Sequence, residues 1–210
     1  MNYATLTELI KRYCENEETS FIANIPSFVQ MAEQRIYNTV PMLATRKNVT
    51  GTTTQNRPYL SLPSDWLATH SAALVTPGTP EHQYLLNKEV EFIRESFPYP
   101  NNTGVPQYYA NFDNDTILLG PTPDNHYQIE LHYFAYPTSI VTAGTTWLGN
   151  NFDNLLLYGA LREAYLYMKG ESDMVGYYEE KYKEGVVLLK NLTDTRAHRD
   201  DFRFSQARGQ

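Results

Sequence analysis

Residues 150–192 read NNFDNLLLYGALREAYLYMKGESDMVGYYEEKYKEGVVLLKNL, and this stretch predicts two long helices. From residue 155 to 168, apolar residues recur every three to four positions, which is typical of a helix with one buried face. Gly170 ends this helix, and Ser172 or Asp173 caps a second helix that keeps the same period to the end of the stretch. We expect the two helices to pack antiparallel.

Two shorter helices are predicted near the N-terminus. Residues 5–15 place their apolar side chains at helical spacing, which indicates a first helix with one face turned inward. A second helix is expected to begin near Asn24, a suitable N-cap, with Pro26 in its first turn, where the missing N–H costs little. Its apolar period continues until Pro41 stops it.

Residues 45–145 have a different texture, because β-branched and aromatic residues alternate with polar ones and Pro and Gly recur every few positions. This pattern predicts a β-rich insertion with strands at residues 47–54, 59–62, 72–75, 107–112, 116–119 and 127–136. The turn-forming residues between the last three strands predict a three-stranded meander over residues 107–136. Two short helices are expected to interrupt the strands, at residues 64–69 and 88–97.

These patterns together predict an α+β fold, in the form of an antiparallel helical bundle with a β-rich insertion and an extended C-terminal arm. The bundle would take residues 1–44 and 146–192, and the insertion residues 45–145. Residues 193–210 would form the arm, which has too few large apolar residues to fold by itself.

The bulk composition limits the possible functions. The 210 residues carry a formal net charge of −7, which argues against a protein dedicated to nucleic-acid binding, because such proteins need clustered Lys and Arg. The same charge fits a wall past which DNA slides without adhering. The single cysteine, Cys14, excludes an intramolecular disulfide and a Cys-based zinc site. Its neighbours in the first helix favour ordinary packing over a reactive thiol.

Signals for export or membrane insertion are not found in the sequence. No apolar run approaches the roughly 20 residues that a membrane span needs. The N-terminus lacks the apolar core of a signal peptide. We therefore expect a protein that is made and kept in a reducing cytoplasm and has no membrane partner.

The sequence offers no set of residues typical of an enzyme. It contains no HExxH pair, GxSxG elbow, phosphate-binding P-loop or dinucleotide-binding glycine turn. Of the five histidines, only His126 and His132 lie close together, on one face of a predicted strand, and ordinary surface positions explain them better than metal binding. Adjacent glutamates such as Glu179 and Glu180 diverge by about 100° on a helix and are typical of a solvated face. We expect no catalytic residue, no cofactor and no metal.

Tyrosine is unusually abundant, with 17 residues. Its side chain combines apolar area with a polar tip, which suits protein interfaces as well as the margins of cores. Because the last two predicted helices carry so many tyrosines, we expect Tyr158, Tyr165 and Tyr178 to lie at or beside contacts between subunits.

Three motifs carry a resemblance that spans nearly the whole chain. They are the helix start IPSF at residues 25–28 with AEQRI at 32–36, the turn LPSDW at residues 62–66, and the strand and proline turn ILLGPTP at residues 117–123, followed by the aromatic strand IELHYFAYP at 129–137. Each motif alone is weak. In this order they resemble the head-to-tail adaptors of short-tailed bacteriophages, also called connectors or upper tail tube proteins.

The resemblance implies a structural protein of the virion, located in the tail or neck and made in the host cytoplasm. Twelve subunits would form a ring around the DNA channel, and DNA would pass through the lumen without sequence-specific binding. The ring would grip the portal protein ring above and seat the tail nozzle protein below, with tail fibres as a further partner. The β-rich insertion would face the tail through loops at residues 77–82 and 98–105.

The arm at residues 193–210 is expected to bind the portal. Its arginines can form charge-assisted, bidentate bonds with portal carboxylates, and its phenylalanines can fill shallow pockets. The expected portal-binding residues are Arg196, Arg199, Phe202, Arg203, Phe204 and Arg208.

Two other classes of function stay open. The Tyr-rich strands are compatible with a carbohydrate- or peptide-binding β module carried on a helical scaffold. A cell-wall hydrolase is the second alternative, since some phage head-completion proteins resemble such enzymes. Its candidate acid would be Glu130 or Glu163.

Overall fold

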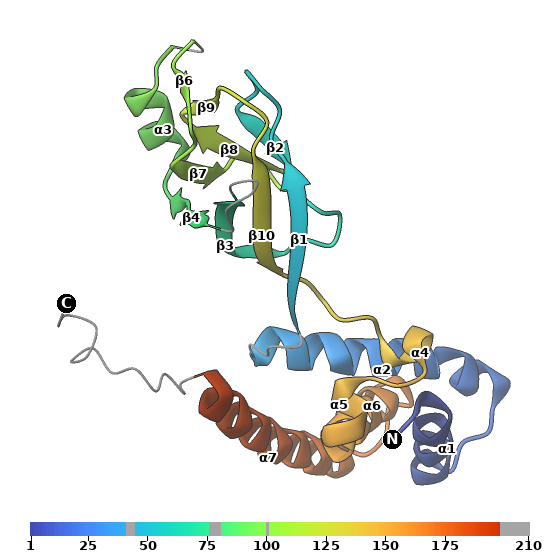
Figure 1. Cartoon of the computed structure of the whole chain (residues 1–210). Helices are drawn as coiled ribbons and strands as arrows, with labels where there is room; N and C mark the ends of the chain where they lie inside the picture. Colours follow the sequence, from blue (N-terminus) through green and yellow to red (C-terminus); the bar gives the residue numbers. More distant parts are fainter. Residues whose placement is uncertain (41–44, 76–80, 100, 198–210) are drawn as a thin grey trace. The chain divides into compact units, whose positions relative to one another are not determined.

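The computed structural model describes residues 1–40, 45–75, 81–99 and 101–197 (Figure 1). The fold is mixed α+β, as predicted. The chain divides into two compact units, Met1–Ala44 together with Pro137–Gln210, and Thr45–Tyr136. We call the first the helical unit and the second the β unit.

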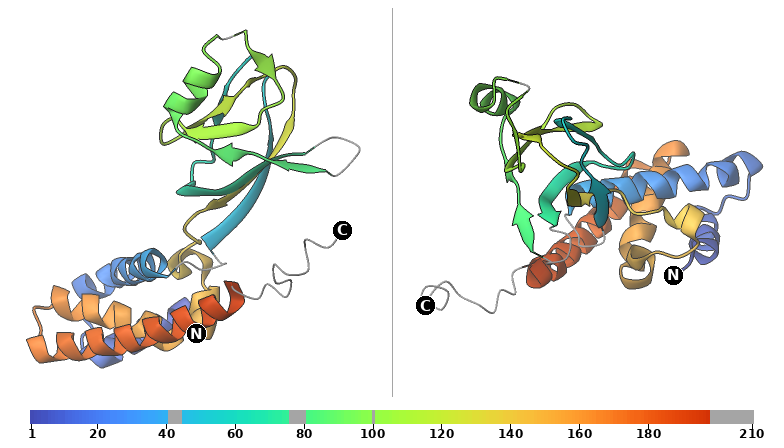
Figure 2. Two further views of the ribbon diagram at one scale, coloured as in Figure 1. Left: turned by 90° about the vertical axis from the view of Figure 1, so that its left-hand side faces the viewer. Right: turned by 45° about the horizontal axis from the view of Figure 1, so that its top comes forward.

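The helical unit contains the helices α1 (Tyr3–Cys14), α2 (Thr19–Thr39), α4 (Ile140–Ala143), α5 (Trp147–Asn151), α6 (Asp153–Tyr167) and α7 (Ser172–Ala197). Helix α6 is central, because it packs against α1, α2, α5 and α7. α6 and α7 lie side by side and run in opposite directions (Figure 2). The helices bury one apolar core, whose fully buried members include Leu6, Ile25, Leu156, Leu161 and Leu189.

Helix α2 begins five residues before the predicted N-cap, so the prediction that Asn24 caps it is wrong. Pro26 lies inside the helix, although it has no N–H to donate to the preceding turn. The extension is favourable because Phe21 is fully buried in the same core as Ile25. Asn24 donates its side-chain amide to the carbonyl of Ser20, at 2.7 Å, within the extra turn.

The turn between α6 and α7 has a hydrogen-bond pattern that the position of Gly170 in the sequence does not predict. Gly170 N–H donates to Tyr165 C=O and Lys169 N–H donates to Leu166 C=O, which is a Schellman motif. The left-handed position, with φ of 54°, is held by Lys169 and not by the glycine. Gly170 is needed for space, since a Cβ at this position would lie 2.8 Å from the Tyr165 ring.

Helix α7 continues to Ala197, so the expected extended arm does not begin at residue 193. Leu189 is buried and Thr193 is half-buried at helical spacing, which explains why the period continues. Of the expected portal-binding residues, only Arg196 belongs to the described helix. The other five lie outside the described residues.

The β unit contains the strands β1 (Arg46–Thr52), β2 (Tyr59–Ser61), β3 (Ala68–Val75), β4 (His82–Tyr84), β5 (Leu86–Asn87), β6 (Thr103–Gly104), β7 (Tyr108–Asn111), β8 (Thr116–Gly120), β9 (Thr122–Pro123) and β10 (Gln128–Phe134), and the helix α3 (Val90–Ser96). One four-stranded sheet has the order β1-β10-β3-β4, and a second has the order β2-β8-β7-β5. The strands β6 and β9 form a separate pair. The two larger sheets share an apolar core that includes Leu74, Ile117, Leu119, Ile129 and Leu131.

The predicted meander over residues 107–136 is wrong, because β10 does not pair with β8. β7 and β8 form an antiparallel pair in one sheet, whereas β10 lies between β1 and β3 in the other. Pro121 and Pro123 stand between β8 and β10, and neither can donate an N–H to a ladder, which is consistent with the change of sheet. The short helix predicted at residues 64–69 is also wrong, since Leu67 N–H bonds Phe134 C=O and β3 begins at Ala68.

Candidate assembly surfaces

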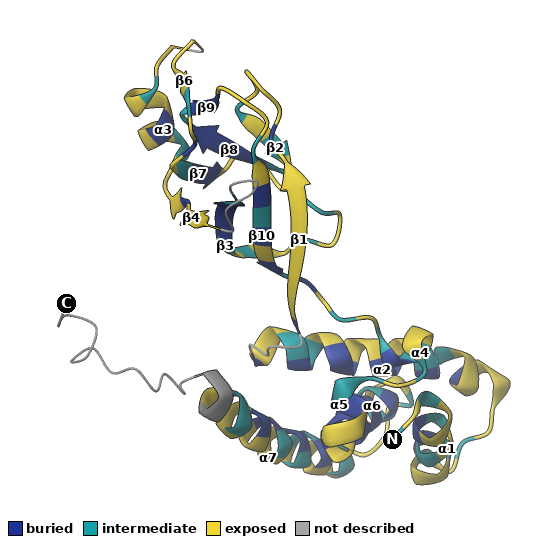
Figure 3. Cartoon of the chain, viewed as in Figure 1, coloured by how far each residue is buried: buried dark blue, intermediate teal, exposed yellow. Residues whose placement is uncertain are grey.

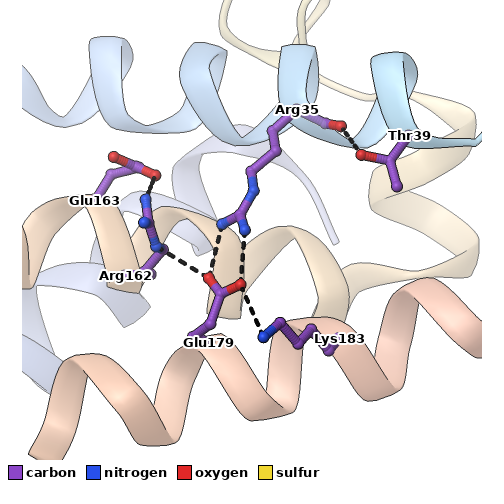
Figure 4. Close-up of polar contacts among 6 residues, drawn as sticks. All are labelled: Arg35, Thr39, Arg162, Glu163, Glu179 and Lys183. Atoms are coloured by element: carbon purple, nitrogen blue, oxygen red, sulfur yellow. Dashed lines mark hydrogen bonds and ion pairs between the residues drawn. The ribbon is translucent and has the colours of Figure 1, made fainter.

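One carboxylate, that of Glu179 on α7, collects cations from three helices (Figure 4). Arg35 of α2 donates two bonds to it, from Nη1 at 2.8 Å and from Nη2 at 2.7 Å. Arg162 of α6 places Nε 3.0 Å from the same carboxylate, and Lys183 places Nζ 3.7 Å from it. The hydrogen bond from Arg35 is the main reason that the pKa of Glu179 lies below its usual value. We call this group the Glu179 cluster.

The Glu179 cluster fixes how α2, α6 and α7 lie against one another. Its bidentate geometry is specific, since a planar guanidinium matches a carboxylate in one orientation. The Arg35 guanidinium also lies 4.4 Å from the centre of the Tyr182 ring, beneath which the core begins. Because the Glu179 side chain is 22% exposed, the cluster contributes more to orientation than to stability.

Glu33 is a buried residue of α2, and its side chain joins α2 to α4. Only 2% of the residue is exposed, and its carboxylate accepts from Ile140 N–H at 2.9 Å. Burial raises the pKa of Glu33, and the bonds from Ser139 and Ile140 oppose that rise. This contact explains why residues 137–145 belong to the helical unit, whereas the sequence assigned them to the β-rich insertion.

The three tyrosines expected at subunit contacts form one cluster within the chain. The ring of Tyr178 lies 6.3 Å from that of Tyr158 and 5.1 Å from that of Tyr165. Tyr158 and Tyr165 are half-buried, and Tyr178 is only 3% exposed. Much of the tyrosine content of α6 and α7 is therefore used in the core. That these three lie at or beside a contact between subunits stays a prediction.

The outer face of α7 carries apolar side chains that the core does not use. Tyr177, Val187 and Leu188 are 48%, 56% and 63% exposed. Their spacing puts them on one side of the helix together with Glu180 and Glu184, opposite the buried face (Figure 3). We call this the α7 outer face.

The exposed face of α2 has no charge over five turns. The exposed residues of α2 are all uncharged, namely Thr19, Ser20, Ile22, Ala23, Ser27, Gln30, Met31, Gln34, Asn38 and Thr39, while the charged Glu33 and Arg35 turn toward the other helices. Exposed helix faces of soluble proteins usually carry charges, and the centres of interfaces are depleted in them. The α2 face therefore has the composition of a contact surface, whereas the α7 outer face combines exposed apolar side chains with Glu180 and Glu184.

The family model for the SU10 adaptor protein matches residues 1–207. The chain belongs to the SU10 adaptor protein family. This is a family of structural phage adaptors and not of enzymes, so the chain is a structural protein of the virion that contacts other phage structural proteins. No curated protein matches the chain. In the part that the structure describes, no helix is long and apolar enough to cross a membrane.

In this adaptor the motifs that carry the resemblance have structural roles. Glu33 and Arg35 of AEQRI hold α4 and α7, as described above. In LPSDW, Asp65 accepts from Lys47 and, at 3.0 Å, from the Tyr133 hydroxyl, which ties the turn to β1 and β10. In ILLGPTP, Gly120 leaves space for α3, because a Cβ there would lie 2.7 Å from Ile93. No local pattern predicts that Glu179 pairs with Arg35, since 144 residues separate them.

The residues considered for catalysis lie in ordinary surroundings in the adaptor. Glu130 accepts from Asn48 and pairs with His82, and these bonds lower its pKa, which is the wrong direction for a general acid. Glu163 pairs with Arg162. His126 lies outside β10, and the centre of the His132 ring lies 6.4 Å from that of His70. Within the described ranges, no three His, Cys, Asp or Glu residues are grouped so as to hold a metal ion.

Cys14 lies against the helical core, and burial raises the pKa of its thiol to about 11. The thiolate is therefore scarce at neutral pH, which agrees with a packing role.

The β unit has an aromatic hollow of about 370 Å³ beside β2 and α3. Its lining includes the apolar Ile93 and Leu118 and the aromatic Tyr59 and Tyr99, of which Tyr99 is 70% exposed. Arg94 supplies the one charged side chain among the described lining residues.

Proposed function

We propose that twelve copies of this chain form a ring that joins the portal to the tail nozzle around the DNA channel. The observation that carries the proposal is the family match, which takes in both units and not a single motif. In this proposal the helical unit is the antiparallel bundle that builds the ring, and the β unit is an insertion that contacts the nozzle and the tail fibres. The net charge of −7 supports a lumen that repels phosphate.

The α7 outer face supports ring formation by the helical unit. A head-to-tail ring requires two different faces on each subunit that complement each other. The α7 outer face and the uncharged face of α2 are the candidates for such a pair, since both expose apolar side chains on a helix. Tyr158 and Tyr165, half-buried on α6, would lie at the margin of this contact, and Tyr178 would support them from within the core.

The arm is proposed to bind the portal after docking. Arg196, at the end of α7, would start the contact, and the residues beyond the described chain, Arg199, Phe202, Arg203, Phe204 and Arg208, would complete it. Ordering such a segment costs about 1 to 2 kcal/mol per residue in backbone entropy, so a single arm binds weakly. A ring presents many arms at once, and their combined avidity makes the joint lasting.

Mass measurement of the purified chain tests the ring and its partner separately. Native mass spectrometry is run on the chain alone, on purified portal rings alone, and on the mixture. A complex that contains one adaptor ring per portal ring is expected. An adaptor that stays monomeric in the mixture at about 10 micromolar would refute the proposal.

The aromatic hollow supports a second candidate, a carbohydrate- or peptide-binding module. Exposed tyrosines beside a single arginine are suited to stacking on sugar rings or on the side chains of a peptide. Tyr99→Ala would abolish such binding on a glycan or peptide array and leave portal binding unchanged. A ring that forms normally and shows no ligand on either array would exclude this candidate.

A further inference from the structure

Strand β1 is an exposed edge of the first sheet of the β unit. It pairs with β10 along all seven of its residues, and it has no neighbour on its other side among the described strands. All seven residues, Arg46–Thr52, are exposed (Figure 3). Edge strands are usually blunted by charged side chains, a proline, a bulge or a covering segment. The charged residues of β1, Arg46 and Lys47, lie only at its first end. β1 contains no proline, and its register with β10 is unbroken.

The hydrogen bonds at its two ends show which backbone groups of β1 are free. Ala135 N–H donates to Thr45 C=O, and Thr53 N–H donates to Tyr127 C=O. In an antiparallel pair, alternate residues turn both backbone groups to the partner strand. The odd-numbered residues of β1 therefore bond β10. The even-numbered residues turn their N–H and C=O groups to the open edge, and they are Arg46, Asn48, Thr50 and Thr52.

Beside β1, part of the apolar surface of the core is exposed. Val49 stands opposite Leu131, and Gly51 opposite Ile129, both of which belong to the core between the two sheets. Val49 is nevertheless 38% exposed. The core thus reaches the edge of the sheet without closing there, and a further strand would cover Val49.

We propose that the β1 edge binds an extended segment of another virion protein, which adds to the sheet as a fifth strand. The proposal rests on the adaptor function, and it names the kind of partner that the β unit takes. Four N–H and four C=O groups supply affinity, and the side chains supply specificity. The segment has about seven residues, no proline at a ladder position, and an apolar side chain beside Val49. A carboxylate lies at the Arg46 end, because Arg46 has no acidic partner among the described residues and Lys47 already pairs with Asp65.

Two pairings between copies of this chain fit the edge less well. The opposite edge of the same sheet is β4, where Leu85 N–H bonds Ala72 C=O, so Gln83 also faces β3 and only His82 and Tyr84 turn outward. This is half of what β1 offers. Two β1 strands that pair with each other would form a closed two-fold dimer, which cannot continue into a ring.

Residue-resolved hydrogen exchange tests the proposal on the wild-type protein. In the free adaptor, the amides of Asn48, Thr50 and Thr52 are expected to exchange rapidly, and those of Val49 and Gly51 slowly. In intact virions the three even-numbered amides should slow at least tenfold. Amides that stay fast in virions overturn the proposal, whereas virions that lack the chain altogether would refute the adaptor function instead.

A pair of proline variants tests the same edge by assembly. Thr50→Pro removes an outward N–H and leaves the bonds between β1 and β10 in place. Tyr84→Pro makes the matched change on the β4 edge. We expect Thr50→Pro to lower the yield of infectious particles at least tenfold and Tyr84→Pro to leave it unchanged, with both purified chains keeping the wild-type circular dichroism spectrum. Equal yields from folded Thr50→Pro and wild type overturn the proposal.

The source of the added strand is decided by where protection appears. Protection of Asn48, Thr50 and Thr52 in virions, but not in purified adaptor rings, supports a partner protein. Protection already present in purified rings overturns the proposal. If truncation after Ala197 then removes that protection, the strand is the C-terminal segment of the chain, and if the protection persists, the strand comes from a second copy.

Discussion

Glu179 and Glu33 have pKa values shifted in opposite directions, so their replacements should change the pH dependence of stability in opposite ways. The pKa of Glu179 is lowered in the folded chain. Its stabilising contribution is therefore present above its ordinary value, near 4.5, and is lost as the pH falls through the lower folded value. Glu179→Gln should cost about 1 to 2 kcal/mol at pH 7, because Arg35 and Arg162 lose their shared anion. The loss should shrink as the pH falls below about 4.5.

Glu33→Gln is the matched control. The pKa of Glu33 is raised by burial, so its contribution is complete below the ordinary value and is lost as the pH rises through the folded value. The amide oxygen of a glutamine can still accept from Ile140 N–H, without a buried charge. Glu33→Gln should equal the wild type near pH 4 and exceed its stability at pH 7. Urea unfolding followed by helical circular dichroism, from pH 3 to 7, measures both. Parallel profiles for all three proteins would contradict the two pKa shifts.

Lys169 bears the backbone strain of the turn between α6 and α7. A non-glycine residue with φ of 54° costs about 1 to 2 kcal/mol relative to glycine, part of which is offset by the entropy of the unfolded chain. Lys169→Gly should therefore stabilise the helical unit by about 0.5 to 1 kcal/mol. Gly170→Ala should destabilise it, because the new Cβ meets the Tyr165 ring. Thermal unfolding of the two variants compares them, and a destabilised Lys169→Gly would show that its side chain has a role of its own.

At the scale of the element, α7 is divided between a core face and the α7 outer face. Leu188→Glu places a charge on the outer face without touching the core, so ring formation should fall at least tenfold while helicity and unfolding temperature stay within error of the wild type. Lys190→Glu, exposed on the same helix but away from that face, is the control. Sedimentation velocity at several concentrations measures the ring. Normal rings from Leu188→Glu would move the subunit contact elsewhere.

Tyr178→Glu tests the core face of the same helix. Because Tyr178 is buried against Tyr158 and Tyr165, the variant is expected to lose about 3 kcal/mol of stability. A loss of assembly in this variant therefore reports on the core of the helical unit and not on a contact between subunits. Tyr158 and Tyr165 are the members of the trio at which charged replacements can report on a contact.

At the scale of the whole molecule, the end of α7 marks where a truncation should be placed. A chain that ends at Ala197 keeps the whole helix, whereas an end at Leu192 would remove its last residues. The truncated chain should fold and form rings but fail to hold the portal. Co-sedimentation with purified portal rings over a salt series measures this, and replacement of Arg199, Arg203 and Arg208 by Gln in the full chain should reproduce most of the loss. Unchanged binding by the truncated chain would exclude the arm as the portal contact.

The sequence by itself determined the elements whose signal is local. Periods of 3.6 residues at 155–168 and in α7 reflect a buried face that recurs along the helix, and alternation in β10 reflects a strand with one buried face, so both are visible without any partner. The order of the three motifs likewise pointed to the family. The pairing of strands and the contacts between helices are visible only in the tertiary structure. In the structure, β10 lies in a different sheet from β7 and β8, and Pro26 lies in the interior of α2. Arg35 pairs with Glu179, and β1 lies at an open edge of its sheet. These outcomes depend on contacts between residues far apart in the chain, which no local pattern encodes.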